Sequence, residues 1–100
     1  MARPQKLADE EIRRRLAELR GWELREGKLF REFRFSDFVQ AFSFLAAAAL
    51  VAEKLDHHPE WSNVYRTVRV FLSTHDAGGV TELDFQLAAT MNELAARWGL

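Results

Sequence analysis

The residues of this chain best suited to chemistry are three histidines, His57, His58 and His75. Imidazole can donate and accept protons near neutral pH, because its unperturbed pKa is about 6.5. His57 and His58 stand where a predicted helix must stop before Pro59. His75 stands where a predicted strand runs into a glycine-rich turn. Catalytic groups are often placed at such element ends, so the three histidines predict an acid–base site.

Two carboxylates accompany the histidines. Glu53 lies one helical turn before His57, so we expect its carboxylate to hydrogen-bond that imidazole and fix its tautomer. Asp84 begins the sheet-facing stripe of the predicted last helix, where an acid is either buried at a cost or faces a cleft. Other interpretations stay open, because Asp84 can simply complete a capping box with Thr81. The histidines are equally acceptable as polar residues at a helix end or in a surface loop.

Metal binding and nucleophilic catalysis are the competing chemistries. Imidazoles and carboxylates bind zinc or iron, but adjacent side chains such as those of His57 and His58 project in different directions. No two histidines are four residues apart on a predicted helix. Cysteine is absent, which removes thiolate ligands and nucleophiles, and no serine lies in a nucleophile-elbow pattern. We therefore expect no metal site and no catalytic triad.

The composition favours one compact domain over residues 1–100. Hydrophobic residues make up 48% of the chain and charged residues 29%, enough apolar material for a core. The net charge of −1, with basic and acidic residues interspersed, does not create the field that nucleic acid or an anionic membrane attracts. We identify no apolar run of membrane-spanning length, and the segment from Met1 to Pro4 leads into charged residues instead of a secretory signal. The sequence thus predicts a cytoplasmic protein.

The hydrophobic periodicity predicts the order helix, hairpin, helix, hairpin, helix. The helices are expected at residues 7–20, at 37–56 with Ser36 as the N-cap, and after Thr81. The hairpin strands are expected at residues 22–25 and 28–35, then at 61–65 and 67–74. Hairpins pair antiparallel, and three apolar helix stripes need a sheet to cover. We therefore expect an α+β domain, αββαββα, whose four-stranded antiparallel sheet carries all three helices on one face.

The predicted middle helix is apolar on both sides from Phe38 to Ala52. Phe38 and Phe42 share one stripe, whereas Phe44 and Val51 lie on the opposite side. One small sheet cannot cover both faces, so we expect a second copy of the chain to cover the other. Alternatively, the alanines merely favour the helix and tolerate water. A homodimer or homotetramer through this helix is the predicted assembly.

A long, discontinuous pattern in the second half of the chain resembles the pterin-4a-carbinolamine dehydratase family. The pattern is an acidic residue, three spacers, His-His-Pro, an aromatic residue, a later histidine and a final aspartate. This sequence supplies it with Glu53, His57-His58-Pro59, Trp61, Tyr65, His75 and Asp84. The likeness also extends through Gly21-Trp22 and the phenylalanine-rich hairpin, so it covers nearly the whole chain.

The resemblance implies a hydro-lyase that dehydrates a 4a-hydroxytetrahydropterin to the quinonoid dihydropterin. This reaction recycles the cofactor that aromatic amino acid hydroxylases oxidise. The family needs no metal ion and no organic cofactor. It also implies an alternative role as a protein-binding module, because animal relatives serve as dimerisation cofactors of a homeodomain transcription factor. The identity of the pterin side chain, the hydroxylase served and the choice between dimer and tetramer stay open.

The resemblance also assigns roles to residues. His57 and His75 are expected to act as general acids toward the departing hydroxyl, while His58 binds the pterin and accepts the ring proton. Glu53 is expected to orient His57, and Asp84 to orient His75 or another imidazole. The implied substrate contacts are His57, His58, Pro59, Thr74, His75, Asp76, Ala77 and Trp22. Trp22 is equally acceptable as a plain core residue.

Overall fold

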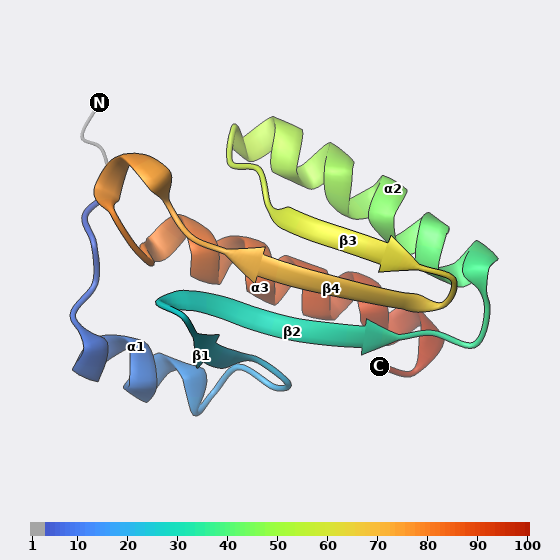
Figure 1. The fold of residues 1–100 in the computed structure, drawn as a ribbon, viewed down its shortest axis with the longest axis horizontal. Coiled ribbons are helices and arrows are strands. Elements are labelled where there is room, and N and C mark those ends of the chain that lie inside the picture. Colours follow the sequence, from blue (N-terminus) through green and yellow to red (C-terminus); the bar gives the residue numbers. More distant parts are fainter. Residues whose placement is uncertain (1–3) are drawn as a thin grey trace.

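The computed structural model describes residues 4–100, and its elements follow the predicted order (Figure 1). Two short 3₁₀ helices, η1 and η2, are added. The elements are α1 Asp9–Leu16, β1 Glu23–Arg25, β2 Lys28–Arg34, α2 Phe38–Leu55, β3 Glu60–Val64, β4 Thr67–Leu72, η1 His75–Ala77, α3 Glu82–Ala95 and η2 Ala96–Trp98. The segment from Met1 to Pro4 was not expected to be a secretory signal. Its first three residues, Met1 to Arg3, lie outside the described residues.

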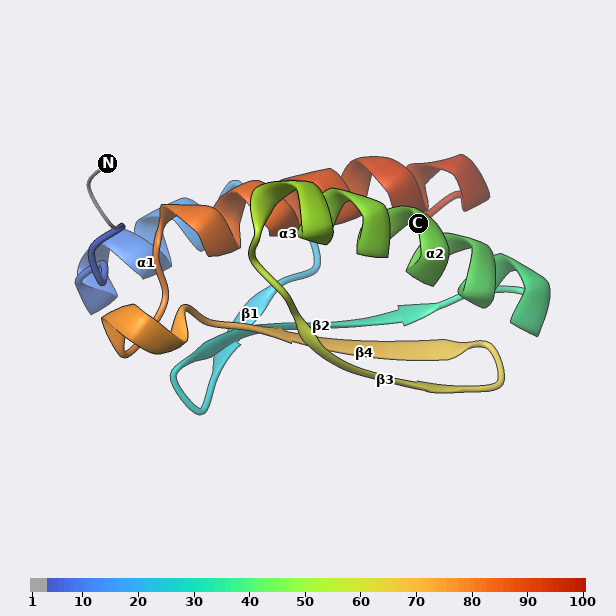
Figure 2. The ribbon, with the colours of Figure 1, turned by 90° about the horizontal axis from the view of Figure 1, so that it is seen from above.

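The described strands form one four-stranded antiparallel sheet in the order β1-β2-β4-β3. The central pair is β2 and β4, in a register that places Leu29 opposite Leu72 and Phe33 opposite Val68. Figure 2 shows α1, α2 and α3 together on one side of this sheet, with the other side uncovered by helices. The predicted α+β architecture, with all three helices on one face, is confirmed.

The core lies between the sheet and the two long helices. Phe44 of α2 is fully buried, with its ring centroid 4.7 Å from that of Phe33 and 5.2 Å from that of Phe35. Arg31 interrupts this apolar face of β2, and its guanidinium lies over the Phe33 ring, 4.3 Å from the centroid. It also donates to the backbone carbonyl of Arg20. Burial lowers the pKa of Arg31, so the packing of this cation carries a desolvation cost.

The first helix is shorter than predicted. It spans Asp9–Leu16 instead of residues 7–20, because the Leu7 amide donates to the Val80 carbonyl at 2.8 Å. Residues before the helix are thereby tied to the loop that precedes α3. At the other end the chain leaves the helix in turns that finish at Gly21, whose φ of 86° suits glycine.

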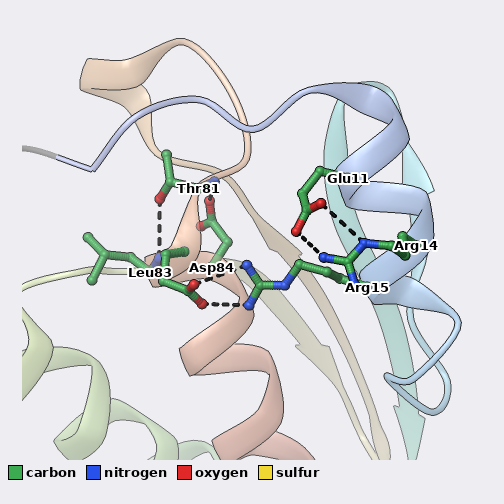
Figure 3. Close-up of polar contacts among 7 residues, drawn as sticks. Glu11, Arg14, Arg15, Thr81, Leu83 and Asp84 are labelled. Carbon is green, nitrogen blue, oxygen red and sulfur yellow. Dashed lines mark hydrogen bonds and ion pairs between the residues drawn. The ribbon is translucent and has the colours of Figure 1, made fainter.

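A salt bridge connects α1 with the start of α3. Arg15 donates to both carboxylate oxygens of Glu82, at 3.0 and 2.5 Å (Figure 3). Its guanidinium also lies over the Phe85 ring, 4.3 Å from the centroid. This hydrogen bonding from Arg15 lowers the pKa of Glu82. Glu82 is exposed and Arg15 partly so, and solvent therefore keeps the contribution of the pair to stability small, about 1 kcal/mol or less.

The N-cap of α2 is Asp37, and the expectation of Ser36 was wrong. The Asp37 side chain accepts a hydrogen bond from the Gln40 amide at 2.8 Å, while the Gln40 side chain in turn accepts from the Ser36 amide. Both serine and aspartate are favoured N-caps, so adjacent candidates are difficult to separate in a sequence. The helix ends at Leu55, and Asp56 adopts the left-handed conformation with φ of 52°.

The two faces of α2 differ sharply in exposure. The inner face packs on the sheet through Ala41, Phe44, Ala48 and Ala52. The large apolar side chains on the opposite side, here called the outer face, are 48 to 75% exposed: Phe38, Val39, Phe42 and Leu50. The stripe of Phe38 and Phe42 therefore points away from this subunit's own core.

The helix α2 is more hydrophobic than was expected from the sequence. Among the described residues it is the one helix long and apolar enough to cross a membrane by length and composition, with 18 residues and a mean hydropathy of 1.5. The expectation that no run of this length existed was therefore wrong. Its charged residues, Glu53 and Lys54, stand in the last turn, where long side chains can reach water. Because the inner face forms part of the core, the helix belongs to the packed domain.

The cap assignment predicts a difference between two adjacent substitutions. Asp37→Ala should lower the free energy of unfolding by about 1 kcal/mol, because the Gln40 amide loses its acceptor. Ser36→Ala, the matched control, should change it by less than about 0.5 kcal/mol. Urea unfolding followed by circular dichroism measures both, and equal losses would contradict the assignment.

Candidate active site

The end of α2 determines where the first two histidines point. Asp56 turns the chain in the left-handed conformation, and the His57 amide donates to the Ala52 carbonyl at 3.0 Å, closing the last turn. The His57 side chain is consequently buried, with the residue only 7% exposed. His58, the next residue, is exposed, and Pro59 then leads into β3. Adjacent histidines are thus placed in different environments.

His57 is hydrogen-bonded to the buried carboxylate of Asp84. The distance between Nε2 of His57 and Oδ1 of Asp84 is 2.5 Å, and Asp84 is fully buried. This bond joins the C-terminal end of α2 to the first turn of α3. The expectation that Asp84 orients an imidazole therefore matches the geometry, and the imidazole is that of His57.

Asp84 also completes the capping box of α3. Its Oδ2 atom accepts from the Thr81 amide at 2.8 Å and from the Thr74 hydroxyl at 2.9 Å. The Thr81 hydroxyl accepts from the Leu83 amide at 3.2 Å, an arrangement visible in Figure 3. The geometry is compatible with both interpretations of Asp84, because one oxygen caps the helix and the other is hydrogen-bonded to the imidazole.

Glu53 does not orient His57, contrary to the prediction. Its carboxylate is hydrogen-bonded to Nε2 of His58 at 2.8 Å, and both side chains are largely exposed, 80% for Glu53 and 58% for His58. The prediction assumed that the helix continues through position 57. Because α2 ends at Leu55, the spacing of one helical turn no longer applies, and the chain reversal brings His58 to Glu53 instead.

The third histidine stands in a tight loop between β4 and α3. Thr74 and Gly79 form an isolated antiparallel bridge, with the Thr74 amide donating to the Gly79 carbonyl at 2.8 Å. The η1 turn closes between them, and Gly78 takes a φ of 76°. His75 begins this turn and is exposed, whereas Thr74 is buried. The bridge fixes the shape of the loop and therefore the backbone position of His75.

All three histidines line one pocket of about 420 Å³. The predicted residues that it brings together are His57, His58, Thr74, His75, Asp76 and Ala77. Four further residues line it that were not predicted as site residues, namely Pro4, Asp56, Ser73 and Leu83. Asp56 and Ser73 adjoin predicted site residues in the sequence, so proximity alone could have indicated them. Pro59 is not among the lining residues.

Trp22 belongs to the core and not to the lining of this pocket. Its indole N–H donates to Oδ1 of Asn92 at 2.8 Å, and its ring packs edge-on against Phe33 at a centroid distance of 6.0 Å. Trp22 is 6% exposed. Of the two interpretations left open for this residue, the core role is the one that the geometry supports.

The bond to Asp84 occupies one ring nitrogen of His57, Nε2, and leaves the other, Nδ1. Within residues 4–100 no fully buried side-chain nitrogen or oxygen lacks a hydrogen-bond partner. His57 uses Nε2 on Asp84, and the described residues provide no partner for Nδ1. Nδ1 is therefore not fully buried, and His57 is one of the residues that line the pocket. In the same part of the chain, no group of three or more His, Asp or Glu side chains is arranged to hold a metal ion.

The fold and the pocket define a small α+β protein in which three histidines line one pocket. The sequence model of the family described as pterin 4 alpha carbinolamine dehydratase matches residues 5–94. The chain therefore belongs to this family of hydro-lyases, which confirms the resemblance stated above.

Individual relatives support the same assignment. A protein of Chelativorans sp. (strain BNC1), provisionally named pterin-4-alpha-carbinolamine dehydratase, is 60% identical over 97% of this chain and 100% of its own length. A protein of the same provisional name from Afipia carboxidovorans is 59% identical over 94% of this chain and 96% of its own. A crystal structure described as a transcriptional coactivator/pterin dehydratase from Brucella melitensis superposes with a TM-score of 0.88. It is 49% identical and covers 91% of this chain and 99% of its own.

The two carboxylate–imidazole pairs predict different stability effects. Asp84→Ala should lower the free energy of unfolding by about 3 kcal/mol or more, because it removes the helix cap and leaves buried donors without an acceptor. Glu53→Ala, which removes the exposed carboxylate, should change it by less than about 0.5 kcal/mol. Chemical denaturation measures both variants. A loss in Glu53→Ala as large as that in Asp84→Ala would contradict the described pairing.

Proposed function

We propose that this protein dehydrates a 4a-hydroxytetrahydropterin to a quinonoid dihydropterin and water, by histidine acid–base catalysis. The observation that carries the proposal is the convergence of His57, His58 and His75 on one pocket, with His57 held by the buried Asp84 carboxylate. Membership of the dehydratase family supports the reaction class. The pocket volume falls within the range of about 300 to 1,000 Å³ typical of small-molecule sites.

The reaction needs one proton delivered and one removed. The bond between C4a and its hydroxyl oxygen breaks, and the oxygen leaves as water after it receives a proton. The proton on N5 is removed, and its electron pair forms the double bond between N5 and C4a. The enzyme gives one proton and receives one, so it is unchanged after a turnover once these protons are exchanged. Positioned groups that transfer protons in this manner contribute about 10² to 10⁴ in rate.

The three histidines divide these tasks in the proposed mechanism. His57 and His75 flank C4a and donate toward the departing hydroxyl, and His58 contacts the pterin and accepts the N5 proton. For His57 the donating atom is Nδ1 of the doubly protonated ring, because Nε2 is bonded to Asp84. His58 is exposed and hydrogen-bonded to the exposed Glu53, which suits a group that exchanges its proton with solvent.

The role proposed for this reaction is to recycle tetrahydropterin after aromatic hydroxylation, in the cytoplasm.

Backbone groups of the segments from His57 to Pro59 and from Thr74 to Ala77 hold the polar pterin edge in this proposal. Support for the second segment is its fixed shape, since the Ala77 and Gly78 amides both donate to the Thr74 carbonyl. A loop held in this way can present its remaining polar groups to a ligand without further ordering.

The catalytic proposal predicts the effect of removing each imidazole. His57→Ala, His58→Ala and His75→Ala should each lower kcat, by about 10² or more for at least one of the proton donors. Gln86→Ala, an exposed position on α3, is the control and should leave kcat unchanged. Stopped-flow absorbance with freshly made 4a-hydroxytetrahydropterin measures the rates. Unchanged rates in all three histidine variants would refute the assignment.

We further propose that the outer face of α2 joins copies of this chain into a homodimer or homotetramer. This face exposes four large apolar side chains, those of Phe38, Val39, Phe42 and Leu50. Large exposed apolar patches mark interaction surfaces. A protein partner is the alternative occupant. In its favour, the similar Brucella melitensis structure is described as a transcriptional coactivator as well as a pterin dehydratase.

Self-association through α2 predicts a result in light scattering. The wild-type chain should have the mass of a dimer or tetramer, and Phe42→Asp should shift it toward the monomer, because a charge would be buried in an apolar contact. Phe42→Leu keeps the apolar surface and should retain the assembly. A wild-type chain that stays monomeric at micromolar concentration would exclude self-association and favour a different partner.

A further inference from the structure

Two buried hydroxyl groups lie beneath the Asp84 carboxylate. Thr81 is fully buried and Thr74 is 8% exposed, and their Oγ1 atoms are 2.6 Å apart. The Thr74 hydroxyl is also 2.9 Å from Oδ2 of Asp84. Only Thr74 of this pair lines the pocket, so Thr81 has no route to a ligand of its own.

When the Asp84 carboxylate accepts hydrogen bonds, the hydroxyl hydrogens of Thr74 and Thr81 can be arranged in only one way. Each threonine hydroxyl has a single hydrogen to donate. Thr74 gives its hydrogen to Asp84, so the hydrogen between the two hydroxyls must come from Thr81. The Thr81 oxygen in turn accepts from the Leu83 amide in the first turn of α3. The chain of donors therefore runs from the helix terminus through Thr81 and Thr74 to the carboxylate.

A carboxylate that acts only as an acceptor also determines which ring nitrogen of His57 carries a hydrogen. Oδ2 of Asp84 receives two donors, the Thr74 hydroxyl and the Thr81 amide, and the helix N-terminus also favours a negative charge there. Oδ1 remains as an acceptor for Nε2 of His57. Nε2 therefore carries a hydrogen in both the neutral and the protonated ring, and Nδ1 is the nitrogen that takes up and releases a proton.

We propose that Thr81 is a positioning residue, whose hydroxyl acts through Thr74 and Asp84 to hold His57 in the tautomer with hydrogen on Nε2. The catalytic consequence rests on the function proposed above. The tautomer itself does not, because it is a property of the free protein. Thr81 therefore has a second purpose beyond capping α3, and the hydroxyl is the part of the side chain that serves it.

The test compares hydroxyl removal with hydroxyl retention at position 81. Thr81→Val removes the hydroxyl at nearly constant volume, and Thr81→Ser keeps it. Thr90→Val is the control, because the Thr90 hydroxyl bonds the Gln86 carbonyl in the same helix and does not contact Asp84. Thr74→Val breaks the same chain one link nearer the carboxylate. Folding is checked by circular dichroism, and the His57 tautomer is measured by nitrogen NMR of ¹⁵N-histidine-labelled protein.

The wild-type protein, Thr81→Ser and Thr90→Val should show His57 with hydrogen on Nε2. Thr81→Val and Thr74→Val should show a mixture of tautomers and a kcat lowered by about tenfold or more, the effect of weakening one hydrogen bond to a charged group. Because Thr81 does not line the pocket, KM should be unchanged in Thr81→Val. If Thr81→Val fails to fold, Thr74→Val decides the matter. An unaltered His57 tautomer in the folded valine variants would overturn the proposal, whereas absent turnover in the wild type would refute only the proposed function.

Discussion

The hydrogen bond between His57 and Asp84 is the constraint on which the site depends. It crosses from the end of α2 to the start of α3, and its carboxylate is fully buried. A buried carboxylate needs donors on its oxygens, and the first turn of α3 and the Thr74 hydroxyl provide them. One carboxylate consequently caps α3, connects α3 to the end of α2 and orients the His57 imidazole. A change at Asp84 is expected to affect all three.

This network separates one fixed imidazole from two accessible ones. His57 is held inside the domain, whereas His58 and His75 are exposed at the rim of the same pocket. The proposed dehydration delivers a proton to the hydroxyl oxygen and removes one from N5, and the pocket provides one buried and two exposed imidazoles for these transfers. The outer face of α2 lies on the side of that helix opposite the core, which allows assembly without rearranging the core itself.

The order of the elements was predictable from the sequence because hydrophobic periodicity is local. The pairing of carboxylates with imidazoles was not, since it depends on the left-handed turn at Asp56 and not on the linear spacing of Glu53 and His57. Trp22 was ambiguous for a related reason: its partner Asn92 lies seventy positions away in the chain. The three histidines could be identified as a group because they cluster in the sequence, but their separate environments required the fold.

The central claim is that the pocket around these three histidines catalyses the dehydration of a pterin. The most direct test is the rate at which the unmodified protein converts 4a-hydroxytetrahydropterin, compared with the spontaneous rate in the same buffer. Catalysis at this pocket predicts an acceleration that is proportional to protein concentration and saturates with substrate. Conversion at the spontaneous rate, at every concentration of correctly folded protein, would contradict it.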